Sequence, residues 1–329
     1  MRALTLAGAE VFEWTTLPEA SVPGPGEALV AVRAVGICGT DISGWRGKMP
    51  FISCPRILGH ELGVEVLAVG AGVENVSVGD RCAVEPYLEC GSCHACQQGR
   101  TNCCETLEVL GVHRDGGLRE RLVLPARKLH PCVELGYEQL ALVETLAIGC
   151  HAVDRSALTA AEDALILGAG PIGLSVLEFA RLASERITVL ELSEARRDFV
   201  RRHYPGVQVV ADAAELKPAQ VVFDATGSAV SMAAAFRHAR FTGRVVYVGI
   251  TPDPVPLDDP LLHRRELTLL ASRNALSRDF PRILALIQQG GIRTAPWITH
   301  RADWAELPER MRVWTQPGSG VVKAVVTLA

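Results

Sequence analysis

Short apolar runs alternate with turn residues over about the first 135 positions. The runs at 28–38, 64–70 and 81–86 are rich in β-branched side chains, and stretches such as PGPGE and SVGDR separate them. β-branched residues favour strands, whereas Gly, Pro and Asp favour turns. The pattern therefore predicts a β-rich N-terminal part and not a regular alternation of strands and helices.

The pattern changes near residue 145. Residues 164–169 form a continuous apolar run, and apolar positions then recur at helical spacing over 174–184. Further strands are expected at 187–192, 207–210, 221–226, 244–249 and 267–272, with helices at 194–204 and 232–240. Alternating strands and helices predict an α/β fold with a parallel, doubly wound sheet. A helix at 280–291 and a strand at 320–328 are expected to follow.

Composition narrows the class of protein. The chain has 329 residues, enough for two domains, and its net charge of -4 gives no reason to expect a nucleic acid or an anionic membrane as partner. The N-terminus lacks a long apolar segment, and the run 164–177 is too short to span a membrane. A cytoplasmic location is expected. In a reducing compartment, clustered cysteines indicate metal ligands or catalytic groups before disulfides.

A glycine motif predicts a dinucleotide site. Gly168, Gly170 and Gly173 form G-x-G-x-x-G after a predicted strand and at the start of a predicted helix, with Pro171 and Ile172 between the last two glycines. In this context the glycines allow a tight turn, a close approach of the pyrophosphate and close packing of helix on strand. Glu191 ends the next strand and is expected to accept hydrogen bonds from the ribose hydroxyls. A carboxylate there favours NAD over NADP, although Arg196 can temper its repulsion of a 2′-phosphate.

Half of the ten cysteines lie between residues 90 and 104. Cys90, Cys93, Cys96 and Cys104 have the spacing C-x2-C-x2-C-x7-C, which suits a closed, tetrahedral structural zinc site. Cys103 would break this spacing and is left out of the set. An iron–sulfur cluster and a nucleic-acid-binding zinc ribbon are the alternatives. The lobe 88–105 carries only Arg100 as a cation, which argues against phosphate contacts.

A second set of possible ligands is scattered along the chain. Cys38 and Thr40 are expected at the end of a strand, His60 and Glu61 just before another, and Glu144 where the β-rich part ends. Cysteine, histidine and a carboxylate together form a mixed ligand set. Such a set is typical of an open zinc site, where three protein ligands leave room for water or substrate.

The order of the motifs carries a family resemblance over nearly the whole chain. The motifs are GICGTD, GHE followed by Gly63 and Val66, VGDRC, the four-cysteine lobe, GAGPIG and DATG. With them the chain resembles the zinc-dependent medium-chain dehydrogenase/reductases, the alcohol and polyol dehydrogenase superfamily, of the sorbitol-dehydrogenase-like type. The resemblance implies a GroES-like catalytic domain over 1–145, a Rossmann domain over 146–273 and a C-terminal return to the catalytic domain over 274–329.

The resemblance also implies roles for individual residues. Cys38 and His60 match catalytic zinc ligands, Glu61 matches a carboxylate that can ligate the metal transiently, and Glu144 matches one that ligates directly or through water. Thr40 matches the hydroxyl that takes the substrate proton. Cofactor contacts are implied for Gly168, Gly170, Pro171, Ile172, Gly173, Glu191, Arg196 and Thr226. One departure is Ser43, because many relatives carry a proton-relaying histidine at that position.

The expected activity is therefore an oxidation of a secondary hydroxyl of a polyol, sugar or sugar acid to a ketone. Hydride passes to NAD, and two zinc ions per chain are expected, one catalytic and one structural. An L-threonine 3-dehydrogenase and a general secondary-alcohol dehydrogenase are alternatives, and a non-catalytic NAD-binding zinc protein is a remote one. The expected partner is a small-molecule substrate, with neither nucleic acid nor membrane. A homodimer or homotetramer is expected from the resemblance.

Overall fold

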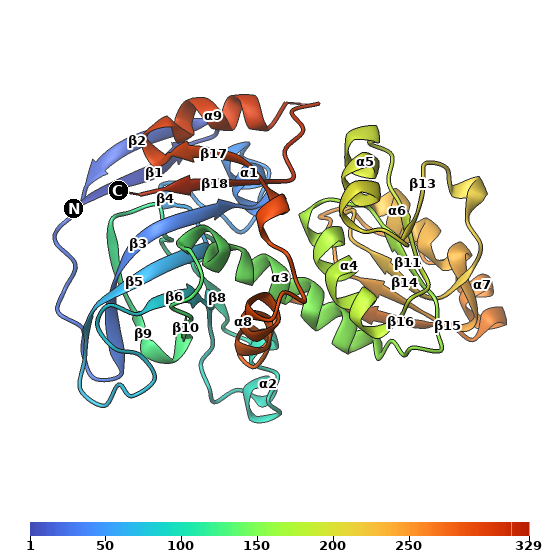
Figure 1. The fold of residues 1–329 in the computed structure, drawn as a ribbon, viewed down its shortest axis with the longest axis horizontal. Helices are drawn as coiled ribbons and strands as arrows, with labels where there is room; N and C mark the ends of the chain where they lie inside the picture. The colour runs from blue at the N-terminus through green and yellow to red at the C-terminus, as the bar shows by residue number, and fades with distance from the viewer. Residues whose placement is uncertain (317, 329) are drawn as a thin grey trace. The chain divides into compact units, whose positions relative to one another are not determined.

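Strand β3 (Glu27–Ile37) organises the β-rich part of the molecule. It pairs antiparallel with β5 (Glu61–Val69) along one edge, and with β9 (Arg121–Pro125) and β18 (Lys323–Thr327) along the other. The main sheet has the order β10-β6-β5-β3-β18-β17. In Figure 1 the red strand β18 lies beside the blue strand β3, so the C-terminal segment completes the sheet that the N-terminal segment begins.

The structure, a computed structural model, describes residues 1–316 and 318–328. The chain divides into two units: unit 1 comprises Met1–Glu144 and the segment that begins at Leu276, and unit 2 comprises Thr145–Ala275. The other strands of unit 1 are β1 (Arg2–Gly8), β2 (Val11–Thr16), β4 (Arg56–Ile57), β6 (Arg81–Val84), β7 (Tyr87–Leu88), β8 (Glu108–Val109), β10 (Leu129–Pro131) and β17 (Ile298–Asp303). Its helices are α1 (Gly39–Trp45), α2 (His94–Gln97), α8 (Asp279–Gln288) and α9 (Leu307–Trp314).

Unit 2 contains the doubly wound sheet. Its strands run parallel in the order β13-β12-β11-β14-β15-β16, which is the strand order of a dinucleotide-binding Rossmann fold. The strands are β11 (Ala164–Leu167), β12 (Ile187–Leu190), β13 (Gln208–Val210), β14 (Ala219–Asp224), β15 (Ala239–Tyr247) and β16 (Thr268–Ala271). The helices are α4 (Pro171–Ala183), α5 (Glu194–His203), α6 (Ala229–Ala235) and α7 (Asp259–Arg265). The predicted fold class is confirmed.

The helix expected at 232–240 is shorter than predicted. α6 ends at Ala235, a 3-10 turn covers Phe236–His238, and β15 begins at Ala239. Met232, Ala235, Phe236 and Ala239 do recur at helical spacing and are all buried. Ala239, however, is buried by pairing with Ala219 of the neighbouring strand. The apolar residues at this point therefore belong to different elements, and their helical spacing does not mark one continuous helix.

Helix α3 (Tyr137–Ser156) carries the chain from unit 1 into unit 2, and Glu144 is the last residue of the first segment of unit 1. The sequence pattern did not predict this helix, nor strands β1 and β2. Every residue from Leu140 to Ala147 is buried. Because α3 is apolar on most of its circumference, it lacks the polar stripe that reveals a surface helix.

Candidate metal and cofactor sites

Cys38 lies at the junction between a strand and a helix. β3 ends at Ile37 and α1 begins at Gly39, so Cys38 is the N-cap residue. The Asp41 carboxylate accepts a hydrogen bond from the Cys38 backbone N–H at 2.9 Å and so closes the first turn of the helix. Thr40 therefore lies in the first turn of α1, and its expected place at the end of a strand is wrong. Ser43 is in the same helix.

His60 and Glu61 lie where β5 begins, on the strand next to β3. Both are buried, and together with Cys38 they offer a sulfur, a ring nitrogen and a carboxylate oxygen that all lie within 4.8 Å of one another. Thiolate, imidazole and carboxylate are ligands that zinc accepts in catalytic sites. The three residues thus fit a zinc ion through the chemistry of their donor atoms and through their proximity.

Asp41 is a functional residue that the sequence reasoning missed. One of its oxygens lies 3.5 Å from Nδ1 of His60, and the same oxygen accepts a hydrogen bond from the Gly59 backbone N–H at 3.2 Å. A carboxylate behind a ligating histidine fixes the ring orientation. Its sequence signal was available, because Asp41 is three residues after Cys38, the spacing of a capping box.

Buried charges around His60 shift its protonation. Burial alone lowers the pKa of His60, but the nearby charges of Asp41 and Cys38 raise that pKa well above its usual value. The His60 charge in turn holds the pKa of Asp41 below its usual value, against the opposite effect of burial. A histidine ligates a metal only when neutral, so metal binding at this site must release a proton.

Two further residues complete the buried cluster. Nζ of Lys323 donates to both oxygens of Glu61, at 2.5 and 2.7 Å, and the Tyr87 hydroxyl donates to Oε1 of Glu144. The pKa of Glu144 is raised, mainly by burial and also by the charge of Glu61. Interactions with His60, Tyr87 and Lys323 oppose this rise but do not cancel it. Among the described residues, the group within mutual ligand range comprises Cys38, His60 and Glu61, and does not include Glu144.

The structure brings four cysteines of the lobe together. The sulfur atoms of Cys90, Cys93, Cys96 and Cys104 all lie within 4.8 Å of one another. Backbone N–H groups of Ser92 and Cys93 lower the pKa of Cys90 to about 5, which favours the thiolate that zinc binds. Cys103 is exposed and lies outside this group of described residues. The donor set and its geometry fit a closed zinc site.

The glycine motif has the geometry that the sequence predicts. Gly168 has φ +91°, a left-handed conformation that favours glycine, and a Cβ on Gly173 would lie 1.9 Å from the Gly168 carbonyl oxygen. Gly170 is the N-cap residue of α4, whose first turn contains Pro171 and Ile172. The helix N-terminus that suits a pyrophosphate is therefore present.

Glu191 follows β12 and is buried beside the glycine turn. Its carboxylate accepts hydrogen bonds from the backbone N–H groups of Ala169, at 2.7 Å, and Ser193, at 2.8 Å. Arg196 lies 3.9 Å from Glu191, half exposed, whereas Arg197 is buried and donates to the Glu191 and Leu192 carbonyls. The Arg197 side chain is therefore held against the backbone next to Glu191.

Thr226 follows β14 within unit 2. Its hydroxyl donates at 2.7 Å to Asp224, a buried carboxylate that also accepts from the Ser231 hydroxyl. Thr226 itself is exposed. Asp224 thus fixes the turn that presents Thr226 to solvent.

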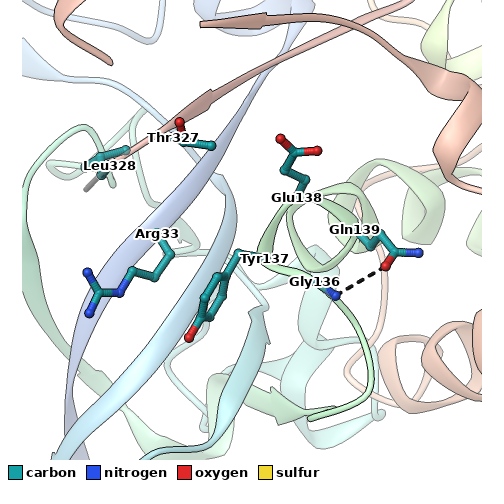
Figure 2. Close-up of a pocket in the computed structure, with 7 residues that line it drawn as sticks. All are labelled: Arg33, Gly136, Tyr137, Glu138, Gln139, Thr327 and Leu328. Atoms are coloured by element: carbon teal, nitrogen blue, oxygen red, sulfur yellow. Dashed lines mark hydrogen bonds between the residues drawn. The ribbon is translucent and has the colours of Figure 1, made fainter. Parts of the chain in front are cut away.

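Figure 2 shows a pocket elsewhere in unit 1, lined by Arg33, Gly136, Tyr137, Glu138, Gln139, Thr327 and Leu328. Its lining includes none of the predicted metal or cofactor residues. Arg33 and Tyr137 both donate to Glu65, at 2.8 and 3.5 Å. Two polar side chains of this pocket are thus engaged with a carboxylate that is not part of its lining.

Comparison with known proteins identifies the class. The family model "Alcohol dehydrogenase GroES-like domain" matches residues 24–134, and "Zinc-binding dehydrogenase" matches residues 171–289. The chain is 38% identical over 319 residues to L-galactonate-5-dehydrogenase of Escherichia coli (strain K12), covering 94% of each chain. It belongs to the zinc-dependent medium-chain dehydrogenase/reductase family, whose members are oxidoreductases that use zinc and a nicotinamide cofactor.

Two solved structures share the whole fold. A putative zinc-binding dehydrogenase from Sinorhizobium meliloti 1021, bound to NADP, superposes with a TM-score of 0.91 at 28% identity and 99% coverage of each chain. The rspB alcohol dehydrogenase of Escherichia coli CFT073, complexed with NADH, gives 0.91 at 27% identity, covering 100% of this chain and 99% of that chain. Among the described residues, the helices are too short or too polar to cross a bilayer.

Proposed function

We propose that the chain oxidises a secondary hydroxyl of a sugar acid, polyol or sugar to a ketone, with transfer of hydride to NAD. The observation that carries this proposal is the group Cys38, His60 and Glu61, of which the last two are buried, with Glu144 beside it and Thr40 in the adjoining helix. A zinc ion bound there would lower the pKa of a substrate hydroxyl. The similarity to an L-galactonate dehydrogenase favours a sugar acid.

The residues of this chain have distinct proposed roles. Cys38 and His60 hold the metal with a carboxylate from Glu61 or Glu144, and Asp41 orients the imidazole. Thr40 would accept the proton of the substrate hydroxyl, and a nicotinamide cofactor held by unit 2 would supply the acceptor for the hydride of the carbinol carbon. The alcohol thus loses a hydride and a proton, and the products are a ketone, NADH and a proton. Because Ser43 replaces the relay histidine, the proton leaves Thr40 through Ser43, water or the cofactor ribose.

The loop after α1 supports an anionic substrate. Lys48 is exposed on this loop, whereas the Arg46 guanidinium is engaged at 2.6 Å with the Thr315 carbonyl oxygen. Lys48 is therefore the cation of this loop that we assign to a sugar-acid carboxylate. A threonine or simple secondary-alcohol dehydrogenase is the second candidate. A simple alcohol would not need this cation, whereas the carboxylate of threonine would use it as a sugar acid does.

We infer that NAD is preferred to NADP. The Glu191 carboxylate stands where a 2′-phosphate would be repelled, and Arg196, 3.9 Å away, offsets only part of that charge. Unit 2 is then the cofactor domain, with contacts from Gly168, Gly170, Pro171, Ile172, Gly173, Glu191, Arg196 and Thr226. The expected domain ranges 1–145, 146–273 and 274–329 stay part of this proposal, with the first and last as one catalytic domain.

Two zinc ions per chain are proposed, the second held by Cys90, Cys93, Cys96 and Cys104 as a closed structural site. A cytoplasmic location is proposed because the ten cysteines are free thiols in the structure. A homodimer or homotetramer is also proposed. The terminal strand β16 supports it, because Leu269 on that strand is 42% exposed.

The test is NADH absorbance with aldonates, polyols, L-threonine and 2-butanol, together with zinc analysis. We expect turnover with a sugar acid or polyol, two zinc ions in the wild-type protein and one in Cys38→Ser, which should still bind NAD but lose turnover. Cys54→Ser, which removes an exposed cysteine, is the matched control and should keep both zinc ions and activity. Full activity in Cys38→Ser would contradict the site assignment. Turnover with none of the substrates in zinc-replete protein would favour the non-catalytic alternative.

A further inference from the structure

Two buried carboxylates lie beside Cys38 and His60, and the structure holds them in different ways. Glu61 is paired with the ammonium group of Lys323, whereas Glu144 accepts a hydrogen bond from the neutral hydroxyl of Tyr87. Both carboxylates and both partners are buried. The difference in partners therefore decides how each carboxylate can move toward a cation bound at Cys38 and His60.

Glu61 is fixed within ligand range of Cys38 and His60. In the paired strands Gly36 lies opposite Glu61, and Ala324, next to Lys323, lies opposite Ile37. A Cβ on Gly36 would lie 2.1 Å from Oε2 of Glu61, so the carboxylate rests on backbone where a larger residue could not fit. Strand register and Lys323 thus keep Glu61 in the three-residue group.

Glu144 is held just outside that group. Glu144 is buried like Glu61, yet among the described residues the group within mutual ligand range is Cys38, His60 and Glu61 and does not include Glu144. The only partner of Glu144 that the described hydrogen bonds include is Tyr87. The Tyr87 hydroxyl lies on an element other than α3, and can therefore tether the carboxylate against a pull toward the metal.

Tyr87 is itself rigidly placed. Its strand β7 pairs with β8 through Val109, and its ring packs against Phe280 with the ring centroids 6.5 Å apart. Lys128 contacts Glu85 and Glu89, the residues two positions before and after Tyr87. The segment that carries the hydroxyl is therefore anchored on both sides.

We propose that Tyr87 is a positioning residue that tethers Glu144 away from the Cys38–His60–Glu61 group and so keeps one coordination position open. The proposal rests on the proposed catalytic zinc. A zinc site with three protein ligands leaves a place for substrate, whereas four protein ligands close it. Without the tether, Glu144 moves in as a fourth ligand, and the metal is held more tightly but in a less active form.

The test compares Tyr87→Phe with the wild-type protein. This change removes the hydroxyl and keeps the ring that packs on Phe280. The time course of zinc release to a chromogenic chelator is measured. The kinetic phase of release that is absent from Cys38→Ser protein is assigned to the catalytic site. We expect Tyr87→Phe to slow this phase by about tenfold or more, the size of effect that changes around metal ligands produce. Turnover should fall, and the absorption spectrum of the cobalt-substituted protein should change.

Two controls separate tethering from a general structural effect. Tyr137→Phe removes the same group from another tyrosine of unit 1, which lines the pocket of Figure 2 and whose hydroxyl donates to Glu65, and it should leave zinc release unchanged. In Glu144→Gln protein, adding Tyr87→Phe should change zinc release no further, because Tyr87 acts only through the carboxylate.

The outcomes distinguish this inference from the proposed function. Faster or unchanged zinc release in Tyr87→Phe would overturn the tether, and so would an equal effect of Tyr87→Phe in the Glu144→Gln background. If Cys38→Ser lost no zinc, the proposed catalytic site itself would fail. A Cys38-dependent phase that Tyr87→Phe leaves untouched would reject the tether alone.

Discussion

Asp41 illustrates how one side chain can shape a site without contacting the metal. One oxygen accepts from the Cys38 backbone N–H, and the other accepts from the Gly59 N–H and faces Nδ1 of His60. The carboxylate therefore joins the two segments that carry the proposed ligands. Its negative charge also favours a ring that donates from Nδ1, which leaves Nε2 as the nitrogen for a metal.

We predict that Asp41→Asn weakens zinc binding at the Cys38 site by about 10–100-fold and lowers turnover similarly, because the neutral amide no longer fixes the imidazole. Zinc titration against a competing chelator measures the first effect, and NADH absorbance measures the second. Asp80→Asn is a matched control, since Asp80 also accepts from the backbone N–H three residues earlier, at 2.8 Å, but in an exposed turn. Equal effects of the two variants would contradict the special role of Asp41.

At this scale the sequence indicated candidate ligands more readily than the residues that support them. Cys38 and His60 are recognisable because each lies in a characteristic motif. Lys323 and Tyr87 are not, because Lys323 reaches Glu61 only through the pairing of β18 with β3, 262 residues away in the chain. A sequence pattern records local spacing, and these contacts depend on strand register.

At the scale of elements, Lys128 connects the segment that follows β6 to the one that precedes β10. Its side chain is 2% exposed, and its ammonium group contacts Glu85 and, at 2.6 Å, Glu89. Glu89 immediately precedes Cys90, the first cysteine of the lobe. Burial raises the pKa of Glu85, but hydrogen bonding from His130 and the charge of Lys128 bring that pKa below its usual value.

We predict that Lys128→Met lowers the free energy of unfolding by about 3–5 kcal/mol at neutral pH, because it leaves the buried Glu85 carboxylate without its cation. In the wild-type protein the lowered pKa of Glu85 gives a stabilisation that is fully present above pH 4.5 and is lost only as the pH falls through the folded-state pKa. In the variant, burial raises the pKa of Glu85, so the variant gains stability as the pH falls.

The difference in unfolding free energy between the two proteins should therefore narrow from pH 8 to pH 5.5, as measured by urea denaturation. Arg310→Met serves as the control, because it breaks an exposed ion pair with Glu306 and should leave the free energy of unfolding almost unchanged at either pH. A difference that stayed constant across this pH range would contradict the assigned role of Glu85.

Elements were predicted well where burial alone sets the pattern and poorly where it does not. The strands of unit 2 are short, continuous apolar runs, as parallel strands covered on both faces must be. The 3-10 turn after α6 was missed because Phe236 and Ala239 are buried for different reasons. Helix α3 was missed because its buried residues form no single stripe.

At the scale of the whole molecule, the two units divide the proposed chemistry. Cys38, His60, Glu61 and Glu144 and the four-cysteine lobe belong to unit 1, whereas the glycine turn, Glu191 and Thr226 belong to unit 2. Unit 1 is discontinuous in sequence, and its sheet is completed only when β18 pairs with β3. Because no local pattern shows this return, the C-terminal segment was placed by family resemblance.

This division predicts that metal binding and cofactor binding can be separated. Removal of zinc with 1,10-phenanthroline should lower turnover by about 10³-fold or more, because metal polarisation supplies several kcal/mol and each 1.36 kcal/mol is a factor of ten in rate. NADH binding, followed by its fluorescence, should change little, since the residues assigned to it lie in unit 2. Glu191→Ala should do the reverse, weakening NADH binding while the zinc content stays at the wild-type value. If the zinc-free protein failed to bind NADH, or if Glu191→Ala lost zinc, the two units would not act as separate sites for metal and cofactor.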